Sequence, residues 1–483
     1  MSKIVLATIN AKWIHPSLAL RLLKANLGDL SESCEILEFA LRQPISEKLT
    51  PILAAQPRIL GLSVSIWNHL ATLELLKKLH TSWRQDGTQW GQKPVVVLGG
   101  PEVSWLPDDA EIFRYANYVI RGEGEKSFST LCNRILNNQE HSEPAGGKIE
   151  CIQQGDTTVN TALIKTAYHL YTDDDLHKKL VYVEASRGCP FNCEFCTGPA
   201  RHKTGKERVR EFPLEAFLAD MEKLIQRGGR TFKFLDRTFN LDIERAKTIM
   251  EFFLERFNTL DPVKCCVHFE MVPSRFPPAL KEIIRRFPPG TLRLELGFQT
   301  CNPQTRELVH ISGNIDEELE VLEFLRRETN VIVHADLIAG LPGESFDSFG
   351  SGFDRVWQVL QQGEQKEGAI FEIQLGILKN LPGTPLHQHN EHYGMRYSPE
   401  PPYEVISTKT LTAGELERIK NFARFWELIV NRYTFPDLVT RLFPPGENVF
   451  EKFMFLADRL QKHFGRNWGI DQKELRLYIE TLH

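Results

Sequence analysis

The sequence has no apolar run that approaches the ~20 residues needed to cross a lipid bilayer. Its first residues, Met1–Thr8, have the pattern of a buried strand and lack the long apolar core and small-residue cleavage site of a signal peptide. It also lacks a strong excess of either charge, with 58 Lys and Arg against 63 Asp and Glu and a formal net charge of -5. These absences predict a cytoplasmic protein that binds neither a membrane nor, as its main partner, nucleic acid, although a local basic patch is compatible with them.

Several familiar signatures are missing as well. No repeat recurs at a fixed period, and none of the glycine-rich segments is a Gly-x-Gly-x-x-Gly dinucleotide fingerprint or a phosphate loop ending in Lys-Ser/Thr. Cysteine occurs nine times, an odd number in a chain of 483 residues without an export signal. That count favours metal or redox chemistry over a disulfide framework. At roughly 100–200 residues per domain, the length suggests two to four domains.

The first 140 residues alternate short β-rich runs with amphipathic helical patterns such as Leu70–Trp83. This alternation predicts a parallel sheet with helices on both faces, which is a doubly wound, flavodoxin-like α/β domain over residues 1–140. Its strands are expected at Lys3–Ile9, Glu35–Phe39, Arg58–Ser65, Pro94–Leu98 and Tyr118–Arg121.

Residues 141–178 are polar and predict a linker with some irregular structure. A second alternating series over 179–395 has six strand–helix units and predicts an open, partial (β/α)6 barrel. Residues 396–483 begin Pro-rich and then show helical patterns, so we expect a mostly helical C-terminal domain. The barrel strands are expected at Leu180–Ala185, Thr231–Leu235, Val263–Phe269, Leu292–Gly297, Val331–Ile338 and Phe371–Leu378, and the clearest helices at Pro213–Arg227, Leu241–Phe257, Ala413–Arg432 and Val449–Phe464.

The strongest chemical signal is a group of three cysteines, Cys189, Cys193 and Cys196, placed directly after the first predicted barrel strand. An iron–sulfur cube is held by cysteine thiolates, and three of them leave one iron open to another ligand. A structural zinc site needs four ligands, and His202 is the nearby fourth candidate, so zinc is the alternative.

This Cys-x-x-x-Cys-x-x-Cys pattern resembles the hallmark of the radical S-adenosylmethionine (SAM) superfamily. The resemblance implies a [4Fe–4S] cluster on these cysteines, with SAM chelated to the open iron, and it places Phe195 beside the adenine. It also implies reductive cleavage of SAM to methionine and a 5′-deoxyadenosyl radical. The cofactors carry that chemistry, while the protein binds them and excludes water.

Further segments at the ends of predicted strands resemble the same superfamily, over roughly residues 180–390. The resemblance implies SAM contacts from five residues: Asp236, Glu295, Gln299, Gly340 and Leu341. The segment around Asp236 departs from the common Gly-Gly-Glu form, and this residue is also a candidate helix cap. The segment Gly340–Gly343, read alone, is an ordinary turn. Carboxyl ends of strands are where barrel active sites lie.

The first domain resembles the cobalamin-binding domain found in one large branch of the superfamily. The implied cobalamin contacts are Ser63, Ser65, Trp67, Gly99, Gly100, Pro101, Glu102, Gly122 and Glu123, all near ends of predicted strands. The alternative is that these glycines only make tight βα turns. The Asp-x-His-x-x-Gly motif that supplies a histidine to cobalt is missing, and His15 in the first loop does not have that spacing. The lower cobalt ligand therefore stays unassigned.

We therefore expect a cobalamin-dependent radical SAM enzyme that methylates an unactivated carbon of an unknown substrate, a small molecule or a peptide, and that receives electrons from a flavodoxin or ferredoxin. The alternatives are a cobalamin-dependent cyclase or rearrangement enzyme, similar to the anaerobic Mg-protoporphyrin ester cyclase, a tRNA-modifying methylthiotransferase-like enzyme, and a non-enzymatic sensor. No catalytic residue is assigned. Cys265, Cys266 and Cys301 are interpreted as buried thiols, and the stretch with His387, His389 and His392 as a solvated loop.

Overall fold

The computed structural model describes residues 3–85, 93–137, 150–153, 159–198, 209–361, 365–444 and 446–482. The chain forms two compact units, and it enters each of them twice. Met1–Arg187 and Val209–Leu235 make up the first unit, and Gly188–Arg208 and Asp236–His483 the second. His202 lies outside the described residues.

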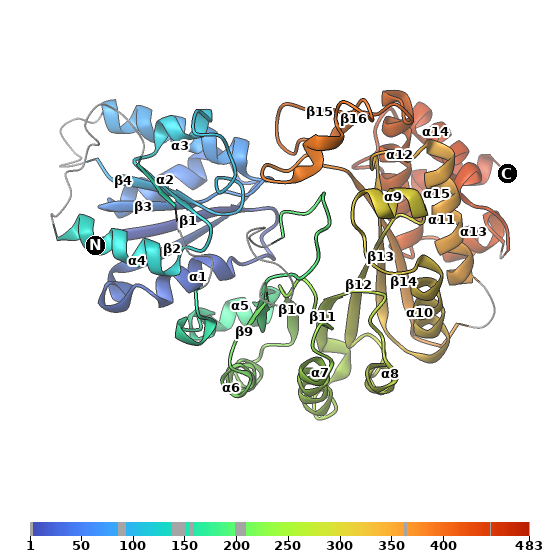
Figure 1. Cartoon of the computed structure of the whole chain (residues 1–483), viewed down its shortest axis with the longest axis horizontal. Helices are drawn as coiled ribbons and strands as arrows, with labels where there is room; N and C mark the ends of the chain where they lie inside the picture. Colours follow the sequence, from blue (N-terminus) through green and yellow to red (C-terminus); the bar gives the residue numbers. More distant parts are fainter. Residues whose placement is uncertain are drawn as a thin grey trace. The chain divides into compact units, whose positions relative to one another are not determined.

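The first unit is built on a six-stranded parallel sheet with strand order β2-β1-β3-β4-β5-β6; Figure 1 labels β1 to β4 of this sheet. The five predicted strands are present, and β6 adds a sixth within the segment predicted as a linker. The order reverses between β1 and β3, which is the switch point of a doubly wound fold. The strands are β1 (Ile4–Asn10), β2 (Cys34–Ala40), β3 (Ile59–Ser63), β4 (Val95–Gly99), β5 (Tyr118–Arg121) and β6 (Glu150–Gln153).

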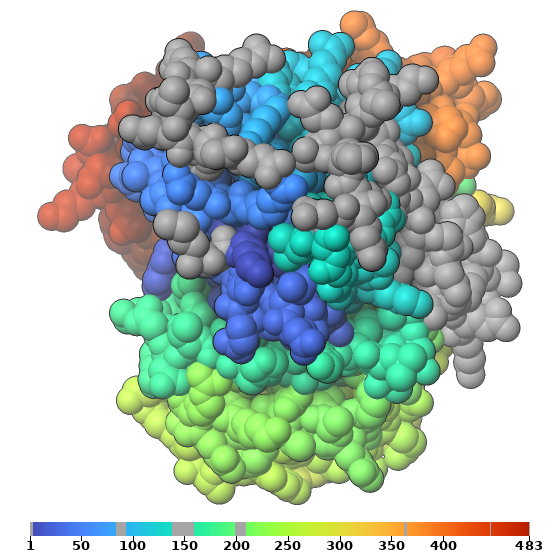
Figure 2. All heavy atoms as spheres, turned by 90° about the vertical axis from the view of Figure 1, so that its left-hand side faces the viewer, coloured from blue at the N-terminus to red at the C-terminus, as the bar shows by residue number. Residues whose placement is uncertain are grey.

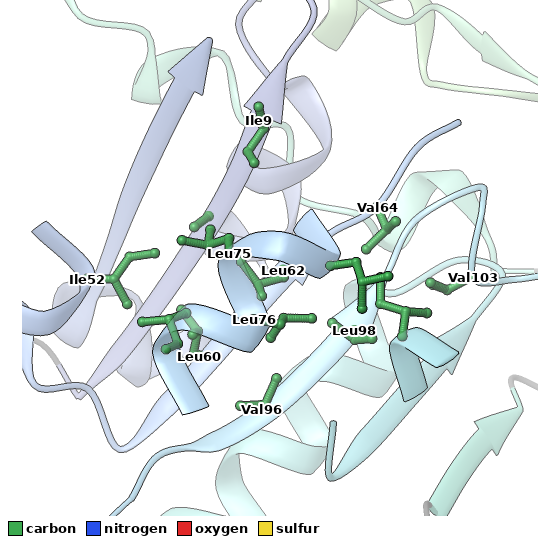
Figure 3. Close-up of a cluster of buried hydrophobic side chains, with 14 of the residues drawn as sticks. Ile9, Ile52, Leu60, Leu62, Val64, Leu75, Leu76, Val96, Leu98 and Val103 are labelled. Atoms are coloured by element: carbon green, nitrogen blue, oxygen red, sulfur yellow. The ribbon is translucent and has the colours of Figure 1, made fainter. Parts of the chain in front are cut away.

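Helices cover both faces of this sheet because its strands are apolar on both sides. One core lies under α2 (Ile45–Ala55) and α3 (His69–Gln85) and contains Leu62, Leu76 and Leu98 (Figure 3). A second core on the opposite face includes Phe128 and Leu131 from α4 (Glu125–Leu136) and Leu20 from α1 (Leu18–Ala25). Loops at the carboxyl edge therefore project from a rigid base.

The later segments of the first unit pack beside its first 60 residues, as the green and blue atoms of Figure 2 show. Arg21 of α1 bonds Asp175 at 2.9 Å, and the Leu180 backbone donates to Ile14. Strand β7 pairs in parallel with β10. These segments contain α5 (Asp173–Lys178), β7 (Val181–Val183), β8 (Ser186–Arg187), β9 (Arg210–Glu211), α6 (Leu214–Gln226) and β10 (Thr231–Phe234).

In the second unit, β11–β14 form a parallel sheet in the order β14-β13-β12-β11, with helices between successive strands. Together with β7 and β10, these strands are the six predicted strand–helix units in chain order. The elements are α7 (Ile243–Phe257), β11 (Cys266–Met271), α8 (Pro278–Arg285), β12 (Leu292–Gln299), α9 (Pro303–Leu308), α10 (Ile315–Glu328), β13 (Ile332–Ala339), α11 (Phe346–Gln361) and β14 (Ile370–Ile377).

The remainder of the second unit is mostly helical. Its helices pack on α11 through stacked and edge-on aromatic rings, with Phe353, Phe422 and Trp426 at the centre. Among the described residues, no helix combines the length and apolarity that a membrane span requires. The elements are η7 (Pro385–His389), β15 (Arg396–Tyr397), β16 (Val405–Ser407), α12 (Ala413–Trp426), η8 (Glu427–Asn431), α13 (Pro436–Leu442), α14 (Phe450–Phe464) and α15 (Gln472–Thr481).

Candidate cluster and cofactor site

A cavity of about 480 Å³ lies in the second unit at the carboxyl ends of β11, β12 and β13. It brings together six of the residues predicted from sequence, and its polar and apolar lining suits a bound small molecule. Those six are Cys189, Cys193, Cys196, Phe195, Glu295 and Gln299.

The three cysteines line one part of this cavity on a loop without regular secondary structure. Burial, with Cys196 and Cys189 close by, raises the pKa of the Cys193 thiol to about 12. Three thiolates this close repel one another, so the charged form needs a cation beside it. Across the described ranges, no group of three His, Cys, Asp or Glu side chains is placed to hold a single metal ion. Three cysteines that line one cavity are donors of the kind that hold an iron–sulfur cluster.

Second-unit loops complete the wall around the cysteines. The Cys189 sulfur lies 3.5 Å from the Thr238 hydroxyl, and the Gly198 backbone donates to the Cys196 sulfur at 3.3 Å. A side chain at Gly198 would contact the Cys196 sulfur at 3.6 Å. Donors to sulfur stabilise thiolates and raise the potential of iron–sulfur clusters. Sequence reasoning missed Thr238, although it follows Asp236 by only two residues.

Strand β12 places Glu295 and Gln299 in the cavity wall, and different local features orient the two side chains. Glu295 lies beside His268 of β11, whose Nε2 is 3.1 Å from its carboxylate. Gln299 follows a bulge in the β12–β13 pairing and has φ 64°, a left-handed conformation that costs energy for a non-glycine residue. Its amide occupies the space that a side chain at Gly297 would need. The bulge thus turns the amide towards the cavity.

One face of the second-unit sheet carries a row of ionisable side chains, of which Glu270 and Glu295 line the cavity. Pairing places Glu270, Glu295, His334 and Glu372 opposite one another on successive strands. His334 lies 3.1 Å from Glu372, and burial raises the pKa of Glu372. Parallel strands buried on both faces are usually apolar, so this polar row marks the inside of the barrel as a functional surface.

Three residues predicted to contact SAM are not among the described residues that line the cavity. Asp236 is buried, while its neighbour Arg237 lines the cavity and lies 4.0 Å from Glu270. Leu341 is fully buried. A side chain at Gly340 would come within 2.5 Å of Val405, and its φ of 90° favours glycine. In this structure, packing alone accounts for that glycine, and the three contacts stay predictions.

The residues predicted to contact cobalamin gather at the carboxyl edge of the first-unit sheet, next to its switch point. Ser63 and Gly99 end neighbouring strands, and Gly122 follows the next one with open space at its Cα. A side chain at Gly100 would meet the Val64 carbonyl at 2.6 Å, so packing requires this glycine. Pro101 is exposed and Ser65 is buried.

The two acidic residues of this set already have protein partners. Glu102 is buried and lies 2.9 Å from Nδ1 of His69. Glu123 receives a hydrogen bond from Arg210 at 2.9 Å, and it lies 3.4 Å from Arg187. These ion pairs join the loops of the first unit to one another. A direct contact from either carboxylate to cobalamin stays a prediction.

The same edge carries large apolar side chains that sequence reasoning, apart from Trp67, did not single out. Trp67 is 53% exposed and Trp13 is 55% exposed. Such exposure over neighbouring loops marks a ligand or partner surface. The others are Ile14, Leu70 and Trp105.

Comparison with known proteins agrees with this geometry. Residues 183–354 match the radical SAM superfamily, and residues 391–478 match a family described as a protein of unknown function (DUF4080). The cobalamin-dependent radical SAM methyltransferase TokK of Streptomyces tokunonensis is 24% identical over 383 residues, which are 74% of this chain and 52% of that protein. The chain thus spans about half the length of this curated relative.

Two solved structures share the fold. The cobalamin-dependent SAM radical enzyme OxsB, with aqua-cobalamin and SAM bound, aligns with a TM-score of 0.62 at 14% identity, over 99% of this chain and 78% of that one. The radical SAM methyltransferase TsrM from Kitasatospora setae, with tryptophan and a SAM analogue bound, gives 0.59 at 17% identity over 80% and 75%. The predicted fold class is confirmed. Residues 183–354 therefore form a radical SAM domain, within a chain that has the fold of the cobalamin-dependent members of that superfamily.

Proposed function

We propose that this protein is a cobalamin-dependent radical SAM enzyme that methylates an unactivated carbon. The observation that carries the proposal is the single cavity in which three cysteines meet polar groups from the ends of β11, β12 and β13. When bound, a [4Fe–4S] cluster supplies the electron that cleaves SAM to methionine and a 5′-deoxyadenosyl radical, while cobalamin carries the methyl group. The electron comes from an external donor such as flavodoxin or ferredoxin.

The chain's own residues have holding and shielding roles. Cys189, Cys193 and Cys196 would hold the cluster, and the carboxylate of Glu295, which lies beside His268, offers an acceptor to the polar groups of SAM. The Gln299 amide can both donate and accept there. The cavity walls exclude water, which protects a reactive radical from side reactions.

The first unit would hold cobalamin at its switch-point edge. Two features support this: the exposed apolar rim with Trp13 and Trp67, and the open space beside Gly122. A corrin ring is large and flat, so it can cover indole rings and approach backbone where no side chain intervenes. The substrate would be a small molecule or a peptide.

The first test is anaerobic reconstitution of the full chain with iron, sulfide and hydroxocobalamin. We expect four irons and one corrin per chain after desalting, and 5′-deoxyadenosine once SAM and reductant are added. Cys189→Ala should lose the cluster and the SAM cleavage because it removes one of three thiolates. Cys266→Ala, which removes a thiol of β11 that does not line the cavity, is the matched control. A cluster that survives in Cys189→Ala would contradict the assignment.

A second test concerns cobalamin. Trp67→Ala should weaken cobalamin binding by at least about tenfold, since burying a large apolar side chain contributes roughly 1.5–3 kcal/mol. Trp468→Ala removes a tryptophan of the second unit that is 65% exposed, and it should leave binding unchanged. The measurement is a titration followed by the corrin absorbance. Equal affinities for the two variants would argue against the edge as the cobalamin site.

A further inference from the structure

The cysteine loop carries a buried carboxylate of its own. Glu194 lies between Cys193 and Cys196, and only 4% of its surface is exposed. Burying a carboxylate is expensive unless polar partners surround it.

Three side chains from two distant segments reach Glu194. His389 of η7 lies 2.5 Å from one carboxylate oxygen, and Gln388 donates to the other at 2.6 Å. His310, which follows α9, lies 3.2 Å from that second oxygen. His389 is itself buried, so this member of the histidine-rich stretch is not solvated, whereas His387 and His392 are exposed.

The backbone adds to this arrangement. The Glu194 N–H donates to the Val309 carbonyl at 3.1 Å, and the Cys193 sulfur lies 3.9 Å from the His310 carbonyl. His310 has φ 55°, an uncommon conformation for a non-glycine residue. The backbone and the side chain of Glu194 thus attach the cysteine loop to the segment after β12 and to the segment after β14.

The cysteine loop has little internal structure to hold it otherwise. Within it, the Cys196 N–H donates to the Cys193 carbonyl at 3.2 Å, and no helix or strand covers its described residues, 188–198. A loop of this kind keeps its sulfurs in place only through outside contacts. Glu194 directly follows Cys193 and lies two residues before Cys196, so the contacts that hold Glu194 also limit how far these two cysteines can move.

We propose that Glu194 is the positioning residue of the cluster site, clamped by His310, Gln388 and His389 so that Cys193 and Cys196 keep a fixed spacing. The inference rests on the proposed function, because it takes the three cysteines as cluster ligands. It assigns the buried part of the histidine-rich stretch to the cluster loop.

The experiment compares Glu194→Ala, Glu194→Gln and His389→Ala with His392→Ala, which removes an exposed histidine three residues from His389. Each full-length variant is reconstituted anaerobically, and two quantities are followed: iron release to a ferrous chelator, and the EPR spectrum of the reduced cluster with SAM. We expect Glu194→Ala to release iron at least tenfold faster and to change the EPR line shape. Glu194→Gln keeps the size of the side chain and one of its two acceptor oxygens, so it should restore both quantities in part, and His392→Ala should match wild type.

A readout without the cluster guards against a general folding defect. In the apoprotein, alkylation of Cys193 and Cys196 by iodoacetamide should accelerate in Glu194→Ala, while far-UV circular dichroism stays unchanged. The double variant Glu194→Ala/His389→Ala should release iron and undergo alkylation little faster than Glu194→Ala alone, because both substitutions remove the same contact.

The outcomes separate the two proposals. If wild type takes up no cluster, the proposed function fails, whatever the variants do. If wild type takes up a cluster and Glu194→Ala equals it in iron release, EPR and alkylation, the positioning role is wrong and the proposed function stands. Fully additive effects of Glu194→Ala and His389→Ala would also overturn the clamp.

Discussion

At the scale of single residues, the carboxyl of Glu344 has an unusual environment. It follows Gly340–Gly343 in the segment after β13, and its side chain is almost completely buried. Burial raises its pKa from 4.5 to about 7, against the opposing hydrogen bonds from Thr300 and Ser348. The folded state therefore binds this proton more tightly than the unfolded state does.

The sign of the pH effect follows from that difference. Since the folded pKa lies above the unfolded one, the free energy of unfolding falls as pH rises from about 4.5 to about 7. The loss is on the order of 3 kcal/mol. Glu344→Gln keeps the acceptor for Thr300 without the charge, so we expect its melting temperature to depend less on pH and to exceed that of wild type at pH 8. Equal pH profiles in thermal melts would contradict this.

The sequence predicts that the three cysteines lie together because all of them fall within eight consecutive residues. The partners of Glu194 could not be found in that way. His389 is 195 positions away along the chain, and only the return of β14 to the same edge of the sheet brings it near. Thr238 was missed for a different reason, since nothing in its local pattern separates a sulfur contact from an ordinary turn residue.

At the scale of elements, the predicted strands and main helices are present because their apolar periodicity is strong. The observed element boundaries differ from the predicted ones where a side-chain cap starts a turn or a helix. A strand was expected from Val263, but Asp261 caps a short turn over Pro262–Lys264, and β11 begins at Cys266. In the predicted linker, Thr172 and Asp175 form a capping box that starts α5. The predicted helix Ala413–Arg432 has a wider turn from Glu427, which periodicity does not reveal.

The joint between α11 and the C-terminal helices offers a prediction at this scale. The Phe353 ring is fully buried and lies 4.8 Å from Trp426 and 5.1 Å from Phe422, measured between ring centroids. Phe353→Ala should lower the stability of the second unit by about 3–5 kcal/mol, because it removes a large buried ring and leaves a cavity. Thermal melts and urea titrations would measure the loss.

The matched control lies in the same group of helices. Phe455 on α14 is 61% exposed, so Phe455→Ala should change stability by no more than about 0.5 kcal/mol. If both variants melt like wild type, the aromatic cluster does not hold the C-terminal helices in place.

At the scale of the whole molecule, the match to the radical SAM superfamily ends at residue 354, within α11, and β14 and the C-terminal helices that follow belong to the same compact unit. The alternation of strands and helices predicted both α/β parts of the fold. It could not show that residues 209–235 return to the first unit. Strand β9 pairs with β8, and β10 pairs with β7. Both β9 and β10 are short, so their own composition does not indicate which strand each one pairs with.

That return has a consequence for synthesis. The cysteines lie in residues 188–208, which belong to the second unit but are synthesised before the first unit ends at residue 235. They therefore leave the ribosome before either unit is complete. The cavity that receives them needs residues as late as Pro385, and 385 − 196 leaves 189 residues still to be made after Cys196. At about 5–20 residues per second, the thiols wait roughly 10–40 s without their enclosing walls. The proposed cluster would therefore be loaded only after synthesis is complete, and until then the three thiols of the nascent chain would lack the cavity walls that enclose them.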